Sequence, residues 1–483
     1  MKKVLVLLVV LAITGISAMA FAAEVTVGGS LEVRSRDFNN LQVLPEDMNL
    51  NTAVTTPLPG STLAATQDAY NKANDQRDTQ NRIRIDINAK TDNVKAKLEL
   101  ESDFQAWGQF VEKYSTSGSS LGFREAWMNF NIPGIPVNVN VGHQLLKLGH
   151  GYFFQSMHFG SDAWVLANVT GNNTAAFVNV KALEGSTYAN DDMDAYVLLD
   201  VVKLSDAMTV GVDITRVNDR RAALTNPAGA GTALTRALGL AANPFSDIVL
   251  NNFSANLTAA LGALNLKAQV DYQTGEAASQ VPGFNGMNIR ANQIIVKGDV
   301  AAGPAKVNFL AARGSGLGNP NDNLTDIKQY VTILDIDPHV AFLYEYKVPT
   351  AAVNAVSQTP TDDQLHTGFA NTTALNLGGA MDVSKSVNIG AQLWMFKATT
   401  PVAIHGATDL FGVKASRDVG NEIDLNVVWK LYDNLTWNWW VGYFMPGEAY
   451  DTPDPIATAL TGLPSNKSAD PATGIQGILK FSF

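Results

Sequence analysis

The chain ends on the sequence GIQGILKFSF, residues Gly474 to Phe483, and this stretch alternates along its length. Apolar or small residues occupy every second position, and Gln476, Lys480 and Ser482 fall between them. A repeat of two residues is the period of a β-strand, whose successive side chains point to opposite faces. The stretch therefore predicts a strand with one apolar face and one more polar face.

The same stretch resembles the insertion signal of bacterial outer-membrane β-barrels, a terminal strand that ends on an aromatic residue. Here the signal would consist of Leu479, Phe481 and Phe483. The resemblance implies that the barrel-assembly machinery of a Gram-negative bacterium recognises this strand. It is specific only in combination with a signal peptide and many further alternating strands.

The N-terminus has the features of a secretory signal peptide. Lys2 and Lys3 precede an apolar run over 4–16, and Ala20-Phe21-Ala22 fits the small-residue cleavage rule. A membrane anchor is disfavoured because the run is too short to span a bilayer comfortably, and no cysteine follows that could carry a lipid. We expect cleavage near Ala22, which leaves residues 23–483 as one domain.

Composition narrows the possible functions. Cleavage removes two lysines and no acid, so 32 basic residues face 45 acidic ones, a balance of −13. That balance disfavours nucleic acid as a partner. The absence of cysteine excludes disulfides, thiolate metal sites and covalently attached c-type haem. After the signal, no apolar run approaches the roughly 20 residues of a membrane helix. The 46% hydrophobic content instead fits alternating strands whose apolar face meets lipid.

Alternation recurs along the whole chain and is clearest at 82–101. The predicted strands are 24–36, 79–90, 94–104, 121–132, 137–143, 162–170, 174–185, 193–202, 207–217, 248–260, 264–274, 288–300, 305–313, 326–335, 339–348, 366–382, 386–397, 420–432, 435–446 and 474–483. Short turns alternate with long polar connections, which is the pattern of outer-membrane barrels. The strand at 162–170 rests on this alternation, since without it a long loop would fall on the side of the short turns.

These features predict an all-β fold: a transmembrane antiparallel up-and-down β-barrel of about 18–20 strands, with short periplasmic turns and long extracellular loops. The strand reading gives twenty, and 18 stays open because boundaries are the weakest part of such a reading. A soluble β-sandwich is disfavoured because it would not need long loops on one side only.

The polar residues of the predicted strands would line the barrel lumen. The candidates are Arg82, Arg84, Asp86, Lys95, Lys97, Glu99, Glu101, Arg124 and Glu125. A loop beginning near His143 is the candidate constriction, through His143, Lys147, His150 and Phe154. Among the aromatic residues, we expect lipid-facing girdles to include Trp437, Trp439, Trp394 and Phe396, and we expect Trp127 and Trp440 to face the lumen.

Two stretches resemble the alginate-export family of outer-membrane porins. Residues 123–151 read FREAWMNFNIPGIPVNVNVGHQLLKLGHG, and residues 420–447 read GNEIDLNVVWKLYDNLTWNWWVGYFMPG. The resemblance implies an 18-stranded channel, which in the anion-exporting members is lined with Arg and Lys. His143 stands where that family usually has Arg, and the charges predicted for this lumen are mixed. The resemblance therefore carries over the channel and not its cargo.

Enzymatic signatures are weak. His143, His150 and His158 could be imagined as metal ligands, but their spacing fits no helix face, and loop or lumen histidines are the favoured reading. Ser156 beside His158 lacks a third catalytic member and an oxyanion motif. The run at 311–318 lacks the ending of a phosphate loop. We expect no enzyme, no metal site and no cofactor.

The leading hypothesis is a passive or weakly selective channel for small hydrophilic solutes, such as organic ions or saccharides, in the outer membrane of a Gram-negative bacterium. The expected partners are outer-membrane lipid and lipopolysaccharide, the barrel-assembly machinery, the solutes, and possible further copies of the chain. One alternative is a barrel sheath around a partner such as an electron-transfer cytochrome. Another is an adhesin whose long loops do the binding.

Overall fold

The computed structural model describes a large part of the chain between Glu24 and Phe483. The described residues are 24–41, 43, 75–106, 121–158, 160–184, 192–220, 245–279, 285–316, 326–333, 341–344, 347–351, 368–404, 415–453 and 466–483. The predicted signal peptide, residues 1–22, lies outside them. Among the described residues, no helix is both long and apolar enough to cross a membrane.

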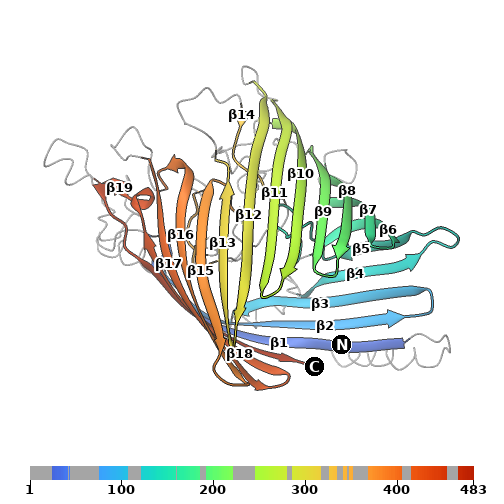
Figure 1. The fold of residues 1–483 in the computed structure, drawn as a ribbon, viewed down its shortest axis with the longest axis horizontal. Coiled ribbons are helices and arrows are strands. Elements are labelled where there is room, and N and C mark those ends of the chain that lie inside the picture. Colours follow the sequence, from blue (N-terminus) through green and yellow to red (C-terminus); the bar gives the residue numbers. More distant parts are fainter. Residues whose placement is uncertain are drawn as a thin grey trace, which may run out of the picture.

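Within these residues, eighteen antiparallel strands form a closed ring (Figure 1). The wall strands are β1 (Glu24–Asn39), β2 (Gln76–Lys90), β3 (Val94–Ala106), β4 (Leu121–Asn131), β5 (Asn138–Gln144), β6 (Ser161–Thr170), β7 (Asn173–Leu183), β8 (Met193–Ser205), β9 (Met208–Asp219), β10 (Phe245–Leu261), β11 (Leu264–Ser279), β12 (Met287–Ala302), β13 (Ala305–Gly314), β15 (Thr372–Asp382), β16 (Val387–Val402), β17 (Ser416–Tyr432), β18 (Leu435–Pro446) and β21 (Ala472–Ser482). Short elements outside the wall are β14 (Asp326–Ile327), the 3-10 turn η5 (Glu448–Tyr450), β19 (Thr452–Pro453) and β20 (Asn466–Lys467). The structure confirms the predicted barrel, with 18 wall strands, the lower end of the predicted range.

The ring closes where β1 pairs with β21, the two strands from opposite ends of the chain (Figure 1). The backbones of Gly29 and Phe483 exchange two hydrogen bonds, of 3.0 and 3.1 Å. A Cβ on Gly29 would lie 2.8 Å from the Phe483 ring, so only glycine fits there. Ile475, Phe481 and Phe483 are exposed on the outside of the ring, as the alternation of the last stretch predicts.

Short turns gather at one end of the strands and long connections at the other, as predicted. Asp92 and Asn93 lie in a turn that joins β2 to β3, and Asp433 and Asn434 join β17 to β18. The strand inferred from this alternation is present as β6. Its neighbours β5 and β7 pair with it along its length.

The predicted strands at 326–335 and 339–348 are wrong. β13 pairs directly with β15, and between them only the two residues of β14 join the sheet, in parallel with β12. The apolar residues that suggested lipid-facing strands are buried instead, with Leu343 0% and Tyr344 2% exposed. Alternation alone does not distinguish a strand facing lipid from a segment packed inside a barrel.

The wall strands separate apolar from polar side chains by their two faces. On β17, Ile423 and Leu425 are 43% and 51% exposed on the outside, whereas Glu422 and Asp424, which alternate with them, are 0% and 1% exposed on the inside. An apolar outer face is what strands in contact with lipid require. The barrel is therefore built for a bilayer.

The aromatic residues of the last wall strands divide between the two faces. Trp429 is exposed on the outside and stacks with Trp437, with ring centroids 6.5 Å apart. Trp440 faces inward and stacks on Phe342, as predicted for the lumen. Trp394 and Phe396, which we expected in a lipid-facing girdle, lie inside instead, because they pack against residues of an inward-folded connection.

Two connections fold into the ring and form its core. Residues 145–158, between β5 and β6, bring Phe153 and Phe154 against the inner face of β7–β12. Residues 326–351, between β13 and β15, supply Tyr330 to the same apolar cluster and Leu343 to a second cluster. The two connections meet where Ile333 N donates a hydrogen bond to Phe153 O at 3.1 Å. The lumen is thus narrowed by two segments in contact.

Candidate functional site: an ion-pair ladder and a lysine cluster inside the barrel

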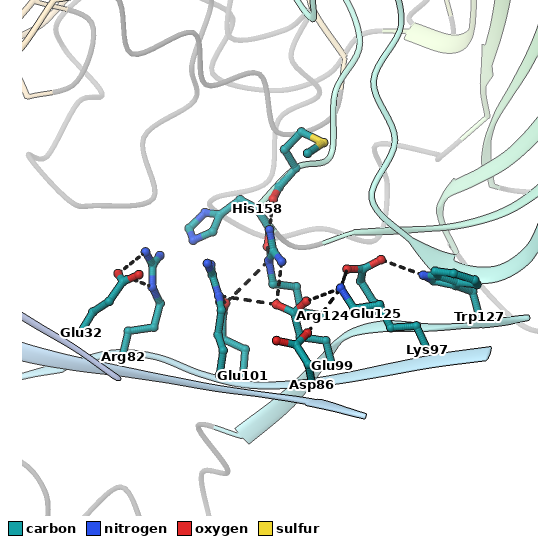
Figure 2. A network of polar contacts seen from close by, with 12 residues as sticks. Glu32, Arg82, Asp86, Lys97, Glu99, Glu101, Arg124, Glu125, Trp127 and His158 are labelled. Carbon is teal, nitrogen blue, oxygen red and sulfur yellow. Dashed lines mark hydrogen bonds and ion pairs between the residues drawn. The ribbon is translucent and has the colours of Figure 1, made fainter. Parts of the chain in front are cut away.

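A dense set of charged side chains covers the inner face of β21 and β1–β4, and we call it the ladder (Figure 2). Its members are Glu32, Arg34, Arg36, Asp78, Arg82, Arg84, Asp86, Lys97, Glu99, Glu101, Arg124, Glu125 and Lys480. They face one another because register places the strand positions side by side, for example Arg82 beside Glu32 and Asp86 beside Glu99. Some register neighbours carry opposite charges, whereas Asp86, Glu99 and Glu125 are three acids side by side on β2, β3 and β4.

Glu99 is the centre of the ladder. One of its oxygens accepts a hydrogen bond from Arg124 at 2.6 Å, and the other accepts from Lys97 at 2.9 Å. Lys97 also donates to Glu125 at 2.5 Å, and Trp127 donates to the second oxygen of Glu125 at 2.7 Å. Charge-assisted bonds of this kind are among the stronger ones in proteins. Glu99 therefore ties β3 to β4.

A β-bulge explains how Arg124 and Glu125 share one face although they are adjacent in sequence. Glu99 pairs with Glu125, but the next residue, Leu100, pairs with Phe123, so Arg124 is the extra residue on β4. A bulge breaks the strict alternation of side chains. The guanidinium of Arg124 also donates to the backbone oxygens of Met157 and His158, at 2.5 and 2.9 Å (Figure 2).

Most of the predicted pore-lining residues meet in this ladder. They are Arg82, Arg84, Asp86, Lys97, Glu99, Glu101, Arg124 and Glu125. Lys95 lies nearer the turn after β2, is exposed, and pairs in register with Lys90. The sequence reasoning missed Glu32, Arg34 and Arg36 of β1. Their alternation with Leu31, Val33 and Ser35 was the signal that would have identified them.

The predicted constriction residues separate into two groups. Lys147, His150 and Phe154 belong to the inward connection 145–158, and Phe154 is buried. His143 does not, because it lies within β5 and its Nδ1 is 2.8 Å from Asp162 on β6. Asp162 is 69% exposed on the outside of the ring. The three histidines considered as metal ligands therefore do not converge.

His150 fixes the inward connection to the opposite wall. Its backbone N–H donates to Gln269 Oε1 at 2.8 Å. Its Nε2 donates to Leu257 O at 3.0 Å, since a carbonyl can only accept. Burial lowers the pKa of His150; the bond to Leu257 opposes this shift, and the charges of three neighbouring lysines add to it. At neutral pH this imidazole is uncharged.

Those lysines form the second charged region, which we call the lysine cluster: Lys147, Lys267 and Lys297. Lys267 and Lys297 are register partners on the inner face of β11 and β12, and Lys147 approaches them from the inward connection. Burial lowers the pKa of Lys147, and the like charges of Lys297 and Lys267 lower it further. In the described part of the chain, no carboxylate lies within 4 Å of any of the three. The Lys297 ammonium instead stands 5.4 Å above the Tyr152 ring.

A cavity opens beside this cluster. Its volume is about 680 Å³, and it extends from Lys267 and Lys297 to the inner faces of β13, β15 and β16. The amides of Asn265, Asn308 and Asn376 contribute to its lining. The carboxylates of Asp206 and Asp299 line it as well. Positive charge and amide groups are surroundings that stabilise a small anion or a polar solute.

Comparisons with known proteins give a likeness of shape only. No family model matches the chain, and no curated protein matches it. Among solved structures, OpdQ of Pseudomonas aeruginosa is 8% identical over 95% of this chain and 98% of that one, with a TM-score of 0.49. A BenF-like porin from Pseudomonas fluorescens is 7% identical over 95% and 98%, with a TM-score of 0.49. The trimer form of the Vibrio cholerae outer-membrane protein OmpT is 11% identical over 96% and 100%, with a TM-score of 0.38. These are outer-membrane β-barrel proteins, and at such identities nothing about the solute of this chain follows from them.

Proposed function

We propose that this protein is an outer-membrane channel for small hydrophilic solutes. One observation carries the proposal: a closed barrel with an apolar outer face has a charged inner face, part of which lacks counter-charges. A barrel that served only as an anchor would have no use for an uncompensated lysine cluster, since unpaired charges are costly where water is restricted. A solute or its counter-ion can supply the missing negative charge.

Within this proposal, the ladder is one wall of the solute path, and the inward connection with Lys147, His150 and Phe154 is the constriction. The net charge of the chain is negative, but a channel selects by the charges at its narrowest level. There the ladder is internally neutralised and the lysine cluster is not. We therefore infer a preference for anions over cations.

Export and insertion are part of the same proposal. Residues 1–22 would act as the cleaved signal, and Leu479, Phe481 and Phe483 would be read by the barrel-assembly machinery. Lipopolysaccharide and phospholipid would then surround the apolar outer face. Mass spectrometry of the protein isolated from outer membranes should find a mature N-terminus at Ala23, and an intact Met1 would contradict the signal.

Membership of the alginate-export family is a finer proposal, supported by the stretches 123–151 and 420–447 and by basic residues inside the barrel. It predicts that uronate oligosaccharides block the ion current from one side. Block by neutral oligosaccharides of equal length, with no block by uronates, would count against it.

The sheath hypothesis is disfavoured by the same geometry. The described parts of the two inward connections, residues 145–158, 326–333, 341–344 and 347–351, occupy the lumen with buried apolar clusters, in the space that a partner protein would need. No observation on the described residues favours the adhesin hypothesis.

The decisive experiment is single-channel recording of the refolded protein in a planar bilayer, with the reversal potential measured under a KCl gradient. We expect stable open steps and a reversal potential of the sign that indicates anion preference. A correctly folded barrel that never conducts would overturn the channel, and cation preference would overturn the role of the lysine cluster. Deleting residues 147–158 should raise the conductance if that connection is the constriction.

A further inference from the structure

The inner wall at β17, β18 and β21 is shaped to hold one particular piece of the chain, residues 341–344. Glu422 accepts a hydrogen bond from Leu343 N at 2.6 Å with one oxygen and from Tyr344 N at 2.8 Å with the other. Asp424 accepts from Phe342 N at 3.3 Å. Three successive backbone N–H groups thus point at two carboxylates. Consecutive N–H groups form a concave site that favours an anion.

The apolar side of the same contact is equally specific. Gly442 and Gly474 are register partners on β18 and β21 and face inward. A Cβ on Gly442 would lie 2.5 Å from the Phe342 ring. A Cβ on Gly474 would meet the Phe38 ring of β1 first and would lie 3.0 Å from Leu343. The absence of both side chains leaves a hollow in the wall, which Phe342 and Leu343 fill together with Phe38.

Aromatic contacts complete the docking on either side of the hollow. The Phe342 ring stacks on Trp440, with centroids 6.0 Å apart and planes 18° apart. Tyr344 stacks on Phe396 at 4.1 Å. The segment is held by side chains of the wall, because the described residues 341–344 add no strand to the sheet. Such a contact can be released without unpairing any wall strand.

We propose that Glu422, Asp424 and the hollow at Gly442 and Gly474 form a latch that holds residues 341–344 against the wall and so sets the open cross-section of the channel. Glu422 and Asp424 are positioning residues in this proposal, since they act on the inward segment and not on the solute. The inference rests on the proposed channel function. It adds a second determinant of pore size, next to the cavity that extends from the lysine cluster to Trp394, the register partner of Glu422.

The test uses a disulfide to hold or free the segment in a single protein. Because the chain has no cysteine, Leu343→Cys with Gly442→Cys introduces the only thiols. The Cβ position of residue 442 lies 3.1 Å from Cγ of Leu343, so the two sulfurs can come within bonding range. These two substitutions are combined with Glu422→Ala and Asp424→Ala. Folding of each variant is checked by its heat-dependent mobility in SDS gels.

We expect the oxidised quadruple variant to conduct less than its own reduced form, because the disulfide then replaces Glu422 and Asp424 in holding residue 343 against the wall. After reduction, its single-channel conductance should rise about twofold or more, because cross-section sets conductance in a water-filled pore. The control is Asp433→Ala, which removes a carboxylate from the turn that joins β17 to β18. It should leave the conductance unchanged in either redox state. Each single-cysteine variant should be insensitive to reductant.

Equal conductance of the reduced and oxidised quadruple variant in folded barrels would overturn the latch while leaving the channel intact. Absence of any conductance in the folded parent would overturn the channel itself, so the two failures are distinct. Glu422→Gln provides an independent check, since its amide retains one acceptor oxygen and should give a smaller rise than Glu422→Ala.

Discussion

The two charged regions inside the barrel differ in how their charges are balanced. In the ladder, each basic residue lies within reach of an acid or an amide, and Glu99 alone accepts from Lys97 and Arg124. In the lysine cluster, the bases approach one another instead, so that Lys297 and Lys267 depress the pKa of Lys147. From this difference we infer that pairing, more than the number of charges in a lumen, sets its selectivity. We expect paired charges to stabilise the wall and unpaired charges to act on the solute.

The strongest test of this comparison removes the lysine cluster. Lys147→Gln, Lys267→Gln and Lys297→Gln together should change the sign of the reversal potential in a KCl gradient from anion to cation preference. The ladder, whose seven basic and six acidic residues nearly cancel, and the acidic groups elsewhere would then remain. Lys385→Gln, in an exposed turn, is the matched control and should change nothing. Unchanged anion preference in the triple variant would break the comparison.

Glu99→Gln tests whether the ion pairs of the ladder stabilise the wall. It removes the shared acceptor of two cations, and we expect a loss of about 1–3 kcal/mol in the free energy of unfolding. The midpoint and slope of guanidinium unfolding in detergent give the value. Lys267→Gln should change stability by less than about 0.5 kcal/mol. Similar losses of unfolding free energy in Glu99→Gln and Lys267→Gln would mean that ion pairing does not distinguish the ladder from the lysine cluster.

Arg124 connects the ladder to the inward connection, so it should affect both wall and constriction. Arg124→Lys keeps the charge but loses the forked donation to Met157 and His158. We expect an unchanged reversal potential with larger fluctuations of the open current, in single-channel records at constant voltage. Fluctuations no larger than those of the parent protein would show that contacts other than those of Arg124 hold the end of the inward connection 145–158.

The smallest effect concerns His150. Because its pKa lies below the ordinary value of 6.5, it gains its charge only as the pH falls below that value. A fourth positive charge beside the lysines should then increase anion preference. The measurement is the reversal potential from pH 7 to pH 5 in the parent and in His150→Gln. Carboxylates elsewhere titrate in both proteins, so only the difference between the two curves reports on His150.

Much of the fold could be predicted from the sequence because the wall follows one rule, the alternation of lipid-facing and inward residues. A second regularity, the alternation of short turns with long connections, predicted the strand at 162–170 that is present as β6. The first rule failed at 326–348, where Val331, Ile333 and Leu343 alternate as a wall strand would. Those residues instead fill the interior, and their contacts with Phe153 and Glu422 join positions far apart in sequence. No local pattern reports such a contact.

The candidate site shows the same division. The ladder residues of β2 and β3 followed from alternation, whereas the shared face of Arg124 and Glu125 depends on a bulge that alternation does not reveal. Lys267 and Lys297 were missed because a lysine on a strand says nothing about its counter-charge. His143 was predicted at the start of the constriction loop, but it is the last residue but one of β5 and pairs with Asp162 on the outer face, a contact between strands that the sequence of β5 does not report.

The seam between β1 and β21 also constrains how the molecule is made. Ser30 of β1 pairs with Ser482 of β21. Because β1 is synthesised first and β21 last, this pairing can form only after nearly the whole chain has been synthesised. Until then the growing sheet has two open edges, each a template for pairing with another chain. The chain is therefore open to pairing with other chains until its last strand is in place. A chain truncated before β21 would lack the strand that pairs with β1, so it could not close into a barrel.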